Sequence, residues 1–395
     1  MMNYYDGMLF FLFLLPVLAG ALIIGYFQKP LRWYILTVSL LAALIIFGAR
    51  PQEGLWLLLF LGWTLGLCRW YLHQRIKGGR NSGVFHLALV LILLPLILCK
   101  ISPLGGWSLF GFTGVSYLSF RTAQILIETY DGLIQELPFA RTLCFLLFFP
   151  SVSSGPIDRS RRFDRDWERT LTREDYLELA GKGLLYLFWG LVYKMILAAW
   201  AYKGMGYLDA PDARWFHWIG YALAYSLYLF FDFAGYSRMA VGSAMILGVE
   251  LPDNFNAPFL AGDIRQFWDR WHITLSHWFR DFIFTRFIMA CTRRKWFRNR
   301  LNRACAGFIV NMAVMGLWHG ISLSYVLYGF YHGILLAGTE YFQKKSGFYR
   351  KNRDRKWFQI LSWAVTMILV VCGFFLFSGK PVELLQRSLD IQAFS

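Results

Sequence analysis

The sequence predicts an all-α membrane protein that crosses the bilayer several times. Of its 395 residues, 57% are hydrophobic, 19% are aromatic and only 16% are charged. A soluble domain carries about 25% charged residues. Apolar runs that approach the ~20 residues of a bilayer-spanning helix also recur along the chain.

In chain order, the apolar runs lie at 8–27, 31–47, 55–72, 85–98, 142–149, 179–200, 215–231, 239–249, 304–317, 322–342 and 358–377. Several are too short to cross a bilayer alone, so we expect partial or re-entrant segments buried in protein. The first run follows MMNYYDG, which has no basic residue, and no small-residue cleavage site is obvious. We therefore expect a retained helix rather than a signal peptide.

The net charge of +16 is concentrated in loops. Residues 292–303 hold six lysines or arginines and no acid, and residues 343–356 hold seven against Asp354 alone. Such an excess marks cytoplasmic loops, on which an acidic partner or anionic lipid can also dock. The bases flank apolar runs instead of covering a folded domain, so we expect no nucleic-acid partner.

The six cysteines are scattered and form no Cys-x-x-Cys pair. This spacing predicts neither a disulfide framework nor structural zinc. The chain also lacks a Gly-x-Ser-x-Gly elbow, a His-Glu-x-x-His motif and a phosphate-binding glycine-rich motif. A serine hydrolase, a metal site and nucleotide-driven transport are therefore disfavoured.

Two connectors stand out. Residues 151–173 mix acids and bases around two aromatic residues, which is typical of an interfacial segment, and the proline-containing stretch 251–264 predicts an irregular loop. From Ile264 to Phe282 the apolar residues recur at helical spacing, with charged residues on the opposite face. We expect one tryptophan-rich amphipathic helix in or near the membrane interface, with its tryptophans as anchors.

Trp318-His319-Gly320 lies between two apolar runs that have the basic loops on their outer sides. With both loops cytoplasmic, runs 304–317 and 322–342 form a hairpin with His319 near its turn. About 15 helical residues climb roughly 22 Å, less than the ~30 Å hydrocarbon core. We therefore expect His319 deep in the membrane, where an ionisable side chain marks a functional site.

Low-dielectric surroundings favour neutral histidine, and neutral imidazole accepts a proton from a hydroxyl as a general base. We expect His319 to be catalytic; the alternatives are a helix-end hydrogen bond and packing under Trp318. His272 is the second candidate, and its alternative is to bridge helices and orient a neighbour. We assign the remaining histidines to structure: His73, His86, His217, His277 and His332.

Four further residues are expected to bind substrate. Trp318 and Trp271 directly precede the two histidines, and Asn256 lies in the irregular loop before His272. Asp232 follows an apolar run in the segment FFDFAGYS. It either orients a histidine or pairs with a basic residue.

Together, several segments resemble the membrane-bound O-acyltransferase (MBOAT) superfamily. Within it, the chain is similar to the DltB branch, D-alanyltransferases that esterify teichoic acids in Gram-positive bacteria. The first third matches mostly in hydropathy. The segments are FFPSVSSGPIDRSRRF at 148–163, FFDFAGYSRMAVG at 230–242, LPDNFNAPFLAGDIRQFWDRWHITLSHWFRDFIF at 251–284, MGLWHG at 315–320 and YGFYHG at 328–333.

The resemblance implies a ring of transmembrane helices around a thin, funnel-shaped centre with re-entrant segments. It implies that His319 is catalytic and that His272 is a second functional position. No cofactor is bound; the donor is a D-alanyl thioester on the phosphopantetheine arm of a cytoplasmic carrier protein. The acceptor is lipoteichoic or wall teichoic acid, reached directly or through an intermediate carrier, and other Dlt-pathway membrane proteins assist in the Gram-positive cell membrane.

We expect a single domain over 1–395, with N-terminal helices at 1–150, a catalytic core with both histidines at 151–342, and a basic loop and last helix at 343–395. A sibling function is O-acetylation of an exported polysaccharide, as in alginate-type acetyltransferases. A transporter or flippase without acyl chemistry is the rival from another class. It predicts charged residues repeated in two halves of the chain, which the sequence does not show.

Overall fold

The computed structural model describes residues 4–5, 7–106, 111–209 and 214–388. The chain divides into two compact units: unit 1 is Met1–Val192 with Gly235–Asp253, and unit 2 is Tyr193–Ala234 with Asn254–Ser395. The described residues are mainly helical, and the β structure among them is an isolated antiparallel bridge between Phe255 and Trp271. The predicted all-α class is confirmed.

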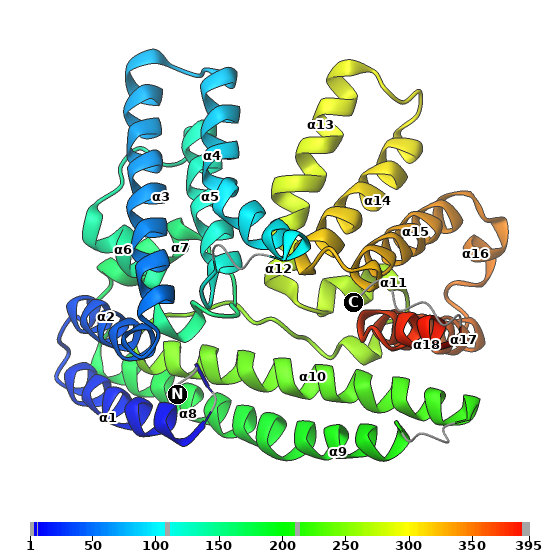
Figure 1. Cartoon of the computed structure of the whole chain (residues 1–395), viewed down its shortest axis with the longest axis horizontal. Helices are drawn as coiled ribbons and strands as arrows, with labels where there is room; N and C mark the ends of the chain where they lie inside the picture. Colours follow the sequence, from blue (N-terminus) through cyan, green and yellow to red (C-terminus); the bar gives the residue numbers. More distant parts are fainter. Residues whose placement is uncertain (1–3, 6, 107–110, 210–213, 389–395) are drawn as a thin grey trace. The chain divides into compact units, whose positions relative to one another are not determined.

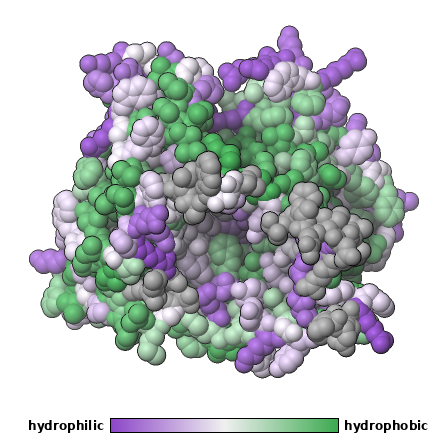
Figure 2. Space-filling view, in the orientation of Figure 1, coloured by the Kyte–Doolittle hydropathy of each residue, from purple (hydrophilic) through white to green (hydrophobic). Residues whose placement is uncertain are grey.

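Among the described residues, six helical stretches are long and apolar enough to cross a membrane: Met8–Tyr26, Pro51–Gly78, Ser82–Ile101, Arg173–Leu208, Arg300–His319 and Lys356–Phe377. Many of their large apolar side chains are exposed, as suits helices solvated by lipid. In Figure 2 hydrophilic residues gather at the loop end of the α3–α4 pair and at that of the α13–α14 pair. The protein is therefore a multi-pass membrane protein.

Unit 1 contains α1 (Gly7–Tyr26), α2 (Arg32–Gly48), α3 (Pro51–Gly78), α4 (Ser82–Ile101), α5 (Val115–Asp131), α6 (Phe139–Leu147), α7 (Ser160–Glu168) and α8 (Arg173–Leu191). Helices α3, α4 and α5 pack on one another (Figure 1). The sequence did not predict α5, because polar residues interrupt its apolar pattern. The structure buries them: Arg121 is 1% exposed and donates hydrogen bonds to the carbonyls of Phe145 and Leu146 at the end of α6.

Unit 2 contains α9 (Ala199–Leu208), most of α10 (Trp215–Ile246), α11 (Ile264–Arg270), α12 (Ile273–Phe279), α13 (Thr285–Arg294), α14 (Arg300–His319), α15 (Leu323–Lys345), α16 (Gly347–Asn352), α17 (Lys356–Phe377) and α18 (Lys380–Ser388). Helix α10 joins the two apolar runs 215–231 and 239–249, which the sequence analysis separated. Its interior tolerates Asp232 because Lys194 donates a hydrogen bond to that carboxylate at 2.5 Å.

The prediction of one amphipathic helix from Ile264 to Phe282 is wrong. Helix α11 ends at Arg270 and α12 begins at Ile273, because His272 adopts a left-handed backbone conformation with φ of 43°. The predicted role of the tryptophans as interface anchors is also wrong, since Trp268, Trp271 and Trp278 are all buried. Helical periodicity shows an apolar face but not whether protein or lipid covers it.

Helices α14 and α15 form the predicted hairpin, packed closely along their length (Figure 1). Glycines permit this approach: a Cβ on Gly316 would lie 2.5 Å from the carbonyl oxygen of Tyr325. A Cβ on Gly329 would lie 2.6 Å from the carbonyl oxygen of Met312. This close packing lies one turn before His319, whose ring centroid is 5.9 Å from that of Tyr325 on α15.

Gly329→Leu should force α14 and α15 apart, because the added side chain has no space at the helix contact. Overpacking of this kind costs about 1–3 kcal/mol, so the melting temperature of the purified protein should fall by several degrees. Gly338→Leu is the matched control on α15, because a Cβ there has nothing within 4 Å. Equal melting temperatures for the two variants would contradict the packing.

Candidate active site

His319 is the last residue of α14, where it lies half-buried among aromatic rings of unit 2. Its ring centroid is 4.5 Å from that of Trp318 and 4.9 Å from that of Phe377, at the end of α17. Tyr325 and Tyr328 on α15 follow at 5.9 and 6.2 Å. These rings lower the local dielectric and hold the imidazole in one place, which suits a base that must meet a hydroxyl.

His272 lies at the break between α11 and α12 and is 5% exposed. The bridge between Phe255 and Trp271 fixes this break, and the amide of Ile273 donates to the carbonyl of Asn254 at 2.9 Å. The ring of Phe233 contacts the imidazole edge-on at 4.6 Å. A residue with a Cβ rarely adopts positive φ, so the surrounding contacts must hold His272 in this conformation.

The side chain of Asn254 orients His272. Its Oδ1 accepts from the Oγ1 of Thr274 at 2.6 Å and pairs with the Nδ1 of His272 at 3.3 Å. Since an amide oxygen only accepts, this bond places the ring hydrogen on Nδ1 and makes Nε2 the lone-pair nitrogen. Burial, helped by the nearby His319, lowers the pKa of His272 well below its ordinary value. The imidazole is therefore neutral.

The two histidines are close enough for a charge on one to affect the other. Trp271 is buried against Phe374, with ring centroids 4.7 Å apart, so it contributes an apolar wall. Asp232 accepts a hydrogen bond from Lys194, as the pairing alternative expected. Asn256 is exposed, and its backbone amide donates to the carbonyl of Arg270. For these residues and for Trp318, substrate binding remains a prediction.

A cleft of about 930 Å³ in unit 2 opens beside α14; we call it cleft A. Met312 and Met315 line it, and Met315 lies one helical turn before His319 on the same helix. Cations from α11, α14, α15 and the segment after α12 surround it: Arg265, Arg280, Arg300, Arg303, Lys344 and Lys345. Two acids, Asp269 and Glu340, also line it, and Glu340 pairs with Arg265 at 3.1 Å.

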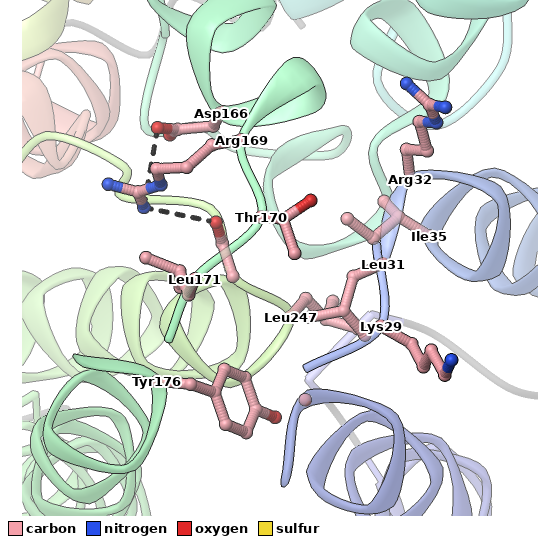
Figure 3. A pocket seen from close by; sticks show the side chains of 12 residues that line it. Lys29, Leu31, Arg32, Ile35, Asp166, Arg169, Thr170, Leu171, Tyr176 and Leu247 are labelled. Carbon is pink, nitrogen blue, oxygen red and sulfur yellow. Dashed lines mark hydrogen bonds and ion pairs between the residues drawn. The ribbon is translucent and has the colours of Figure 1, made fainter. Parts of the chain in front are cut away.

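A smaller cleft in unit 1, of about 20 Å³, has room for roughly one water molecule. Figure 3 shows Arg169 at its edge, where it pairs with Asp166 and donates to the carbonyl of Gly248. No histidine lines this cleft. This cleft lies between loops of unit 1. Because it has no histidine, we take the histidine pair of unit 2 as the candidate active site.

Comparison with known proteins identifies the family of the chain. Residues 26–380 match the MBOAT, membrane-bound O-acyltransferase family. The chain belongs to this family. As an acyltransferase, it joins an acyl donor to an acceptor.

Several curated relatives cover nearly the whole chain. The teichoic acid D-alanyltransferase of Bacillus subtilis is 39% identical over 393 residues, which are 96% of this chain and 99% of the relative. That of Streptococcus thermophilus is 36% identical over 392 residues, 93% of this chain and 91% of the relative. A probable alginate O-acetylase of Pseudomonas aeruginosa is 31% identical over 289 residues, 70% of this chain but 50% of the relative.

Sequence reasoning missed Asn254 and chose Asn256 in this acyltransferase. The two asparagines flank Phe255, and side chains two residues apart in extended chain share a face. The loop is not regular: Asn254 is 2% exposed, whereas Asn256 is exposed. The two asparagines in the loop before His272 were the sequence feature that pointed to a polar contact there. Only the path of the loop shows which of them is buried. Within the described residues, no group of three or more metal-ligating side chains is present.

Asn254→Ala should destabilise the protein, because it removes the acceptor shared by His272 and Thr274. A buried donor left without its partner costs about 1–3 kcal/mol, so the melting temperature in detergent should fall by several degrees. Asn256→Ala, in the same loop, should leave it unchanged. A larger fall for the Asn256 variant would refute the assignment of Asn254 as the orienting residue.

Proposed function

We propose that this acyltransferase transfers D-alanine from a carrier-protein thioester to teichoic acid, with His319 as the general base. The observation that carries the proposal is the position of His319, held in an aromatic enclosure at the end of the helix that also lines cleft A. The names and near-complete coverage of the D-alanyltransferase relatives support the choice of acyl group and acceptor.

In the proposed step, the imidazole of His319 takes the proton of an acceptor hydroxyl as the hydroxyl oxygen attacks the thioester carbonyl carbon. The carbon–sulfur bond then breaks, and the thiolate takes that proton from the imidazolium. The products are a D-alanyl ester and a free carrier thiol, so no net proton is consumed. Such general-base assistance contributes roughly 10²–10⁴-fold to a rate.

His272 positions a reactant in this scheme. With its hydrogen on Nδ1 toward Asn254, the ring offers Nε2 as an acceptor. An acceptor can hold the attacking hydroxyl or the ammonium of the D-alanyl group. Nε2 in this tautomer cannot donate a hydrogen bond to the thioester carbonyl, so we assign His272 to positioning a reactant and not to polarising that carbonyl.

Cleft A is the proposed route of the phosphopantetheine arm. Its cations match the phosphate of the arm and an acidic carrier surface, and its methionines suit a flexible chain. The basic residues of α13 and of the turn before α14 lie at the loop end of this helix pair, which the positive-inside rule assigns to the cytoplasm. A carrier protein, a teichoic acid acceptor and other membrane proteins of the pathway in a Gram-positive plasma membrane complete the proposal.

The sibling function is O-acetylation of a polysaccharide. Its support is the 31% identity to the probable alginate O-acetylase, which extends over half of that protein. The two functions share the base and the cleft and differ in the acyl group and acceptor. A reconstituted reaction distinguishes the two functions by whether the protein transfers a D-alanyl or an acetyl group.

His319→Ala should reduce D-alanyl transfer by at least ~10²-fold, because the hydroxyl loses its proton acceptor. The reaction is followed as labelled D-alanine moving from loaded carrier protein to teichoic acid. His73→Ala, an exposed position on α3, is the control and should retain full transfer. Near-normal transfer by the His319 variant, with an unchanged melting temperature, would remove the mechanism.

Reversing three charges beside cleft A, with Arg293→Glu, Lys295→Glu and Arg298→Glu, should weaken carrier binding. Attraction between exposed charges is screened by salt, so the difference from the unchanged protein should shrink as ionic strength rises. The matched control reverses Lys29, Lys77 and Arg80 in unit 1 and alters net charge equally. Equal weakening by both triple variants would show that net charge, and not this surface, attracts the carrier.

A further inference from the structure

A second large cleft in unit 2 is separate from the histidines and from cleft A. This cleft B has a volume of about 680 Å³ and lies between the loop before α11 and the segment that joins α16 to α17. Leu260, Ile360 and Trp363 line one part of it, and Tyr349, Arg353 and Lys356 line another. Apolar and cationic side chains thus share one cleft.

The walls of cleft B are fixed by hydrogen bonds. The Oγ of Ser362 donates to the carbonyl of Gly262 at 2.6 Å, and the indole of Trp363 donates to the carbonyl of Phe259 at 2.8 Å. Both bonds join α17 to the loop before α11. The cleft is therefore a built feature of the fold and not a gap between loose surface loops.

The cations lie where α17 begins, and the apolar side chains lie further along it. Helix α17 is a candidate membrane span that starts at Lys356. Ile360 is four residues on, about 6 Å along the axis, and Trp363 is about 10 Å along it. Ile360 and Leu260 are 65% and 70% exposed. The order of side chains matches a lipid, with a charged headgroup at the surface and acyl chains below.

The charge of cleft B favours an anion. Among the described residues, the ion pair of Arg353 is with the adjacent Asp354 at 3.4 Å, and both side chains are more than half exposed, so water screens the pair. Lys356 has no ion pair among the described residues. The acid in the cleft, Asp263, already accepts hydrogen bonds from Gln266 and Gln343. The two cations are therefore available to a ligand.

We propose that cleft B binds one anionic phospholipid of the cytoplasmic leaflet. Its phosphate lies between Arg353 and Lys356, and its acyl chains lie against Leu260, Ile360 and Trp363. The basic segment 343–356 places this end of α17 on the cytoplasmic side. The lipid is a structural ligand and neither donor nor acceptor of the acyl group. It links α17 to the loop that leads through α11 to His272.

The test is a titration of the detergent-purified full chain with phosphatidylglycerol, with bound lipid counted by native mass spectrometry. Arg353→Gln with Lys356→Gln should weaken binding of one phosphatidylglycerol by roughly 30-fold, the equivalent of about 1 kcal/mol for each cation. The matched control is Arg350→Gln with Lys351→Gln, which removes the same charge from the same segment outside the cleft. It should change binding by less than about 3-fold.

Two further measurements separate the possible outcomes. Inorganic phosphate should not displace the lipid; displacement at equal concentration would make cleft B a free-anion site and overturn the proposal. Equal weakening by both double variants would show diffuse attraction to the basic segment and overturn it too. Melting temperatures without lipid should match for the two variants, and a selective fall for the cleft variant would show that these cations stabilise the fold instead. D-Alanyl transfer is not used as the readout, so the proposed function is tested separately.

Discussion

The side-chain amide of Asn254 holds His272 in place at the candidate site. Asn254 accepts the hydrogen bonds of His272 and Thr274 through a single oxygen, at a break in the chain that would otherwise continue as a helix. A buried polar group without a partner is costly. The break is stable because the Asn254 amide and the bridge between Phe255 and Trp271 provide hydrogen-bond partners for polar groups at the break. The left-handed conformation of His272 and the tautomer of its ring both follow from this arrangement.

The second histidine is positioned by packing rather than by hydrogen bonds. Glycines let α14 and α15 pack closely next to His319, and rings from α15 and α17 enclose its side chain. The same pair of helices borders cleft A. A proton acceptor and a route for a long flexible donor are thus supplied by one hairpin. Unit 2 therefore contains every residue to which the proposed mechanism assigns a chemical role.

Much of the architecture could be predicted, because a long run of apolar residues indicates a membrane-spanning helix. The hairpin around His319 followed from the basic loops on either side of it. Helix α5 could not be found in this way, since its polar residues are buried in the fold, and the hydrogen bonds that Arg121 donates outside its own helix are not revealed by periodicity. The same limit explains the undivided helix expected over His272 and the choice of Asn256 over Asn254, because both depend on how an irregular loop folds back.

The most direct measurement of the central claim is a reconstituted reaction with purified protein in lipid vesicles and teichoic acid as acceptor. Carrier protein loaded with labelled D-alanine is compared with the same carrier loaded with an acetyl group. The account predicts D-alanyl esters on teichoic acid, formed only by protein that retains His319. Transfer of acetyl but not of D-alanine, or D-alanyl transfer that survives loss of His319, would contradict it.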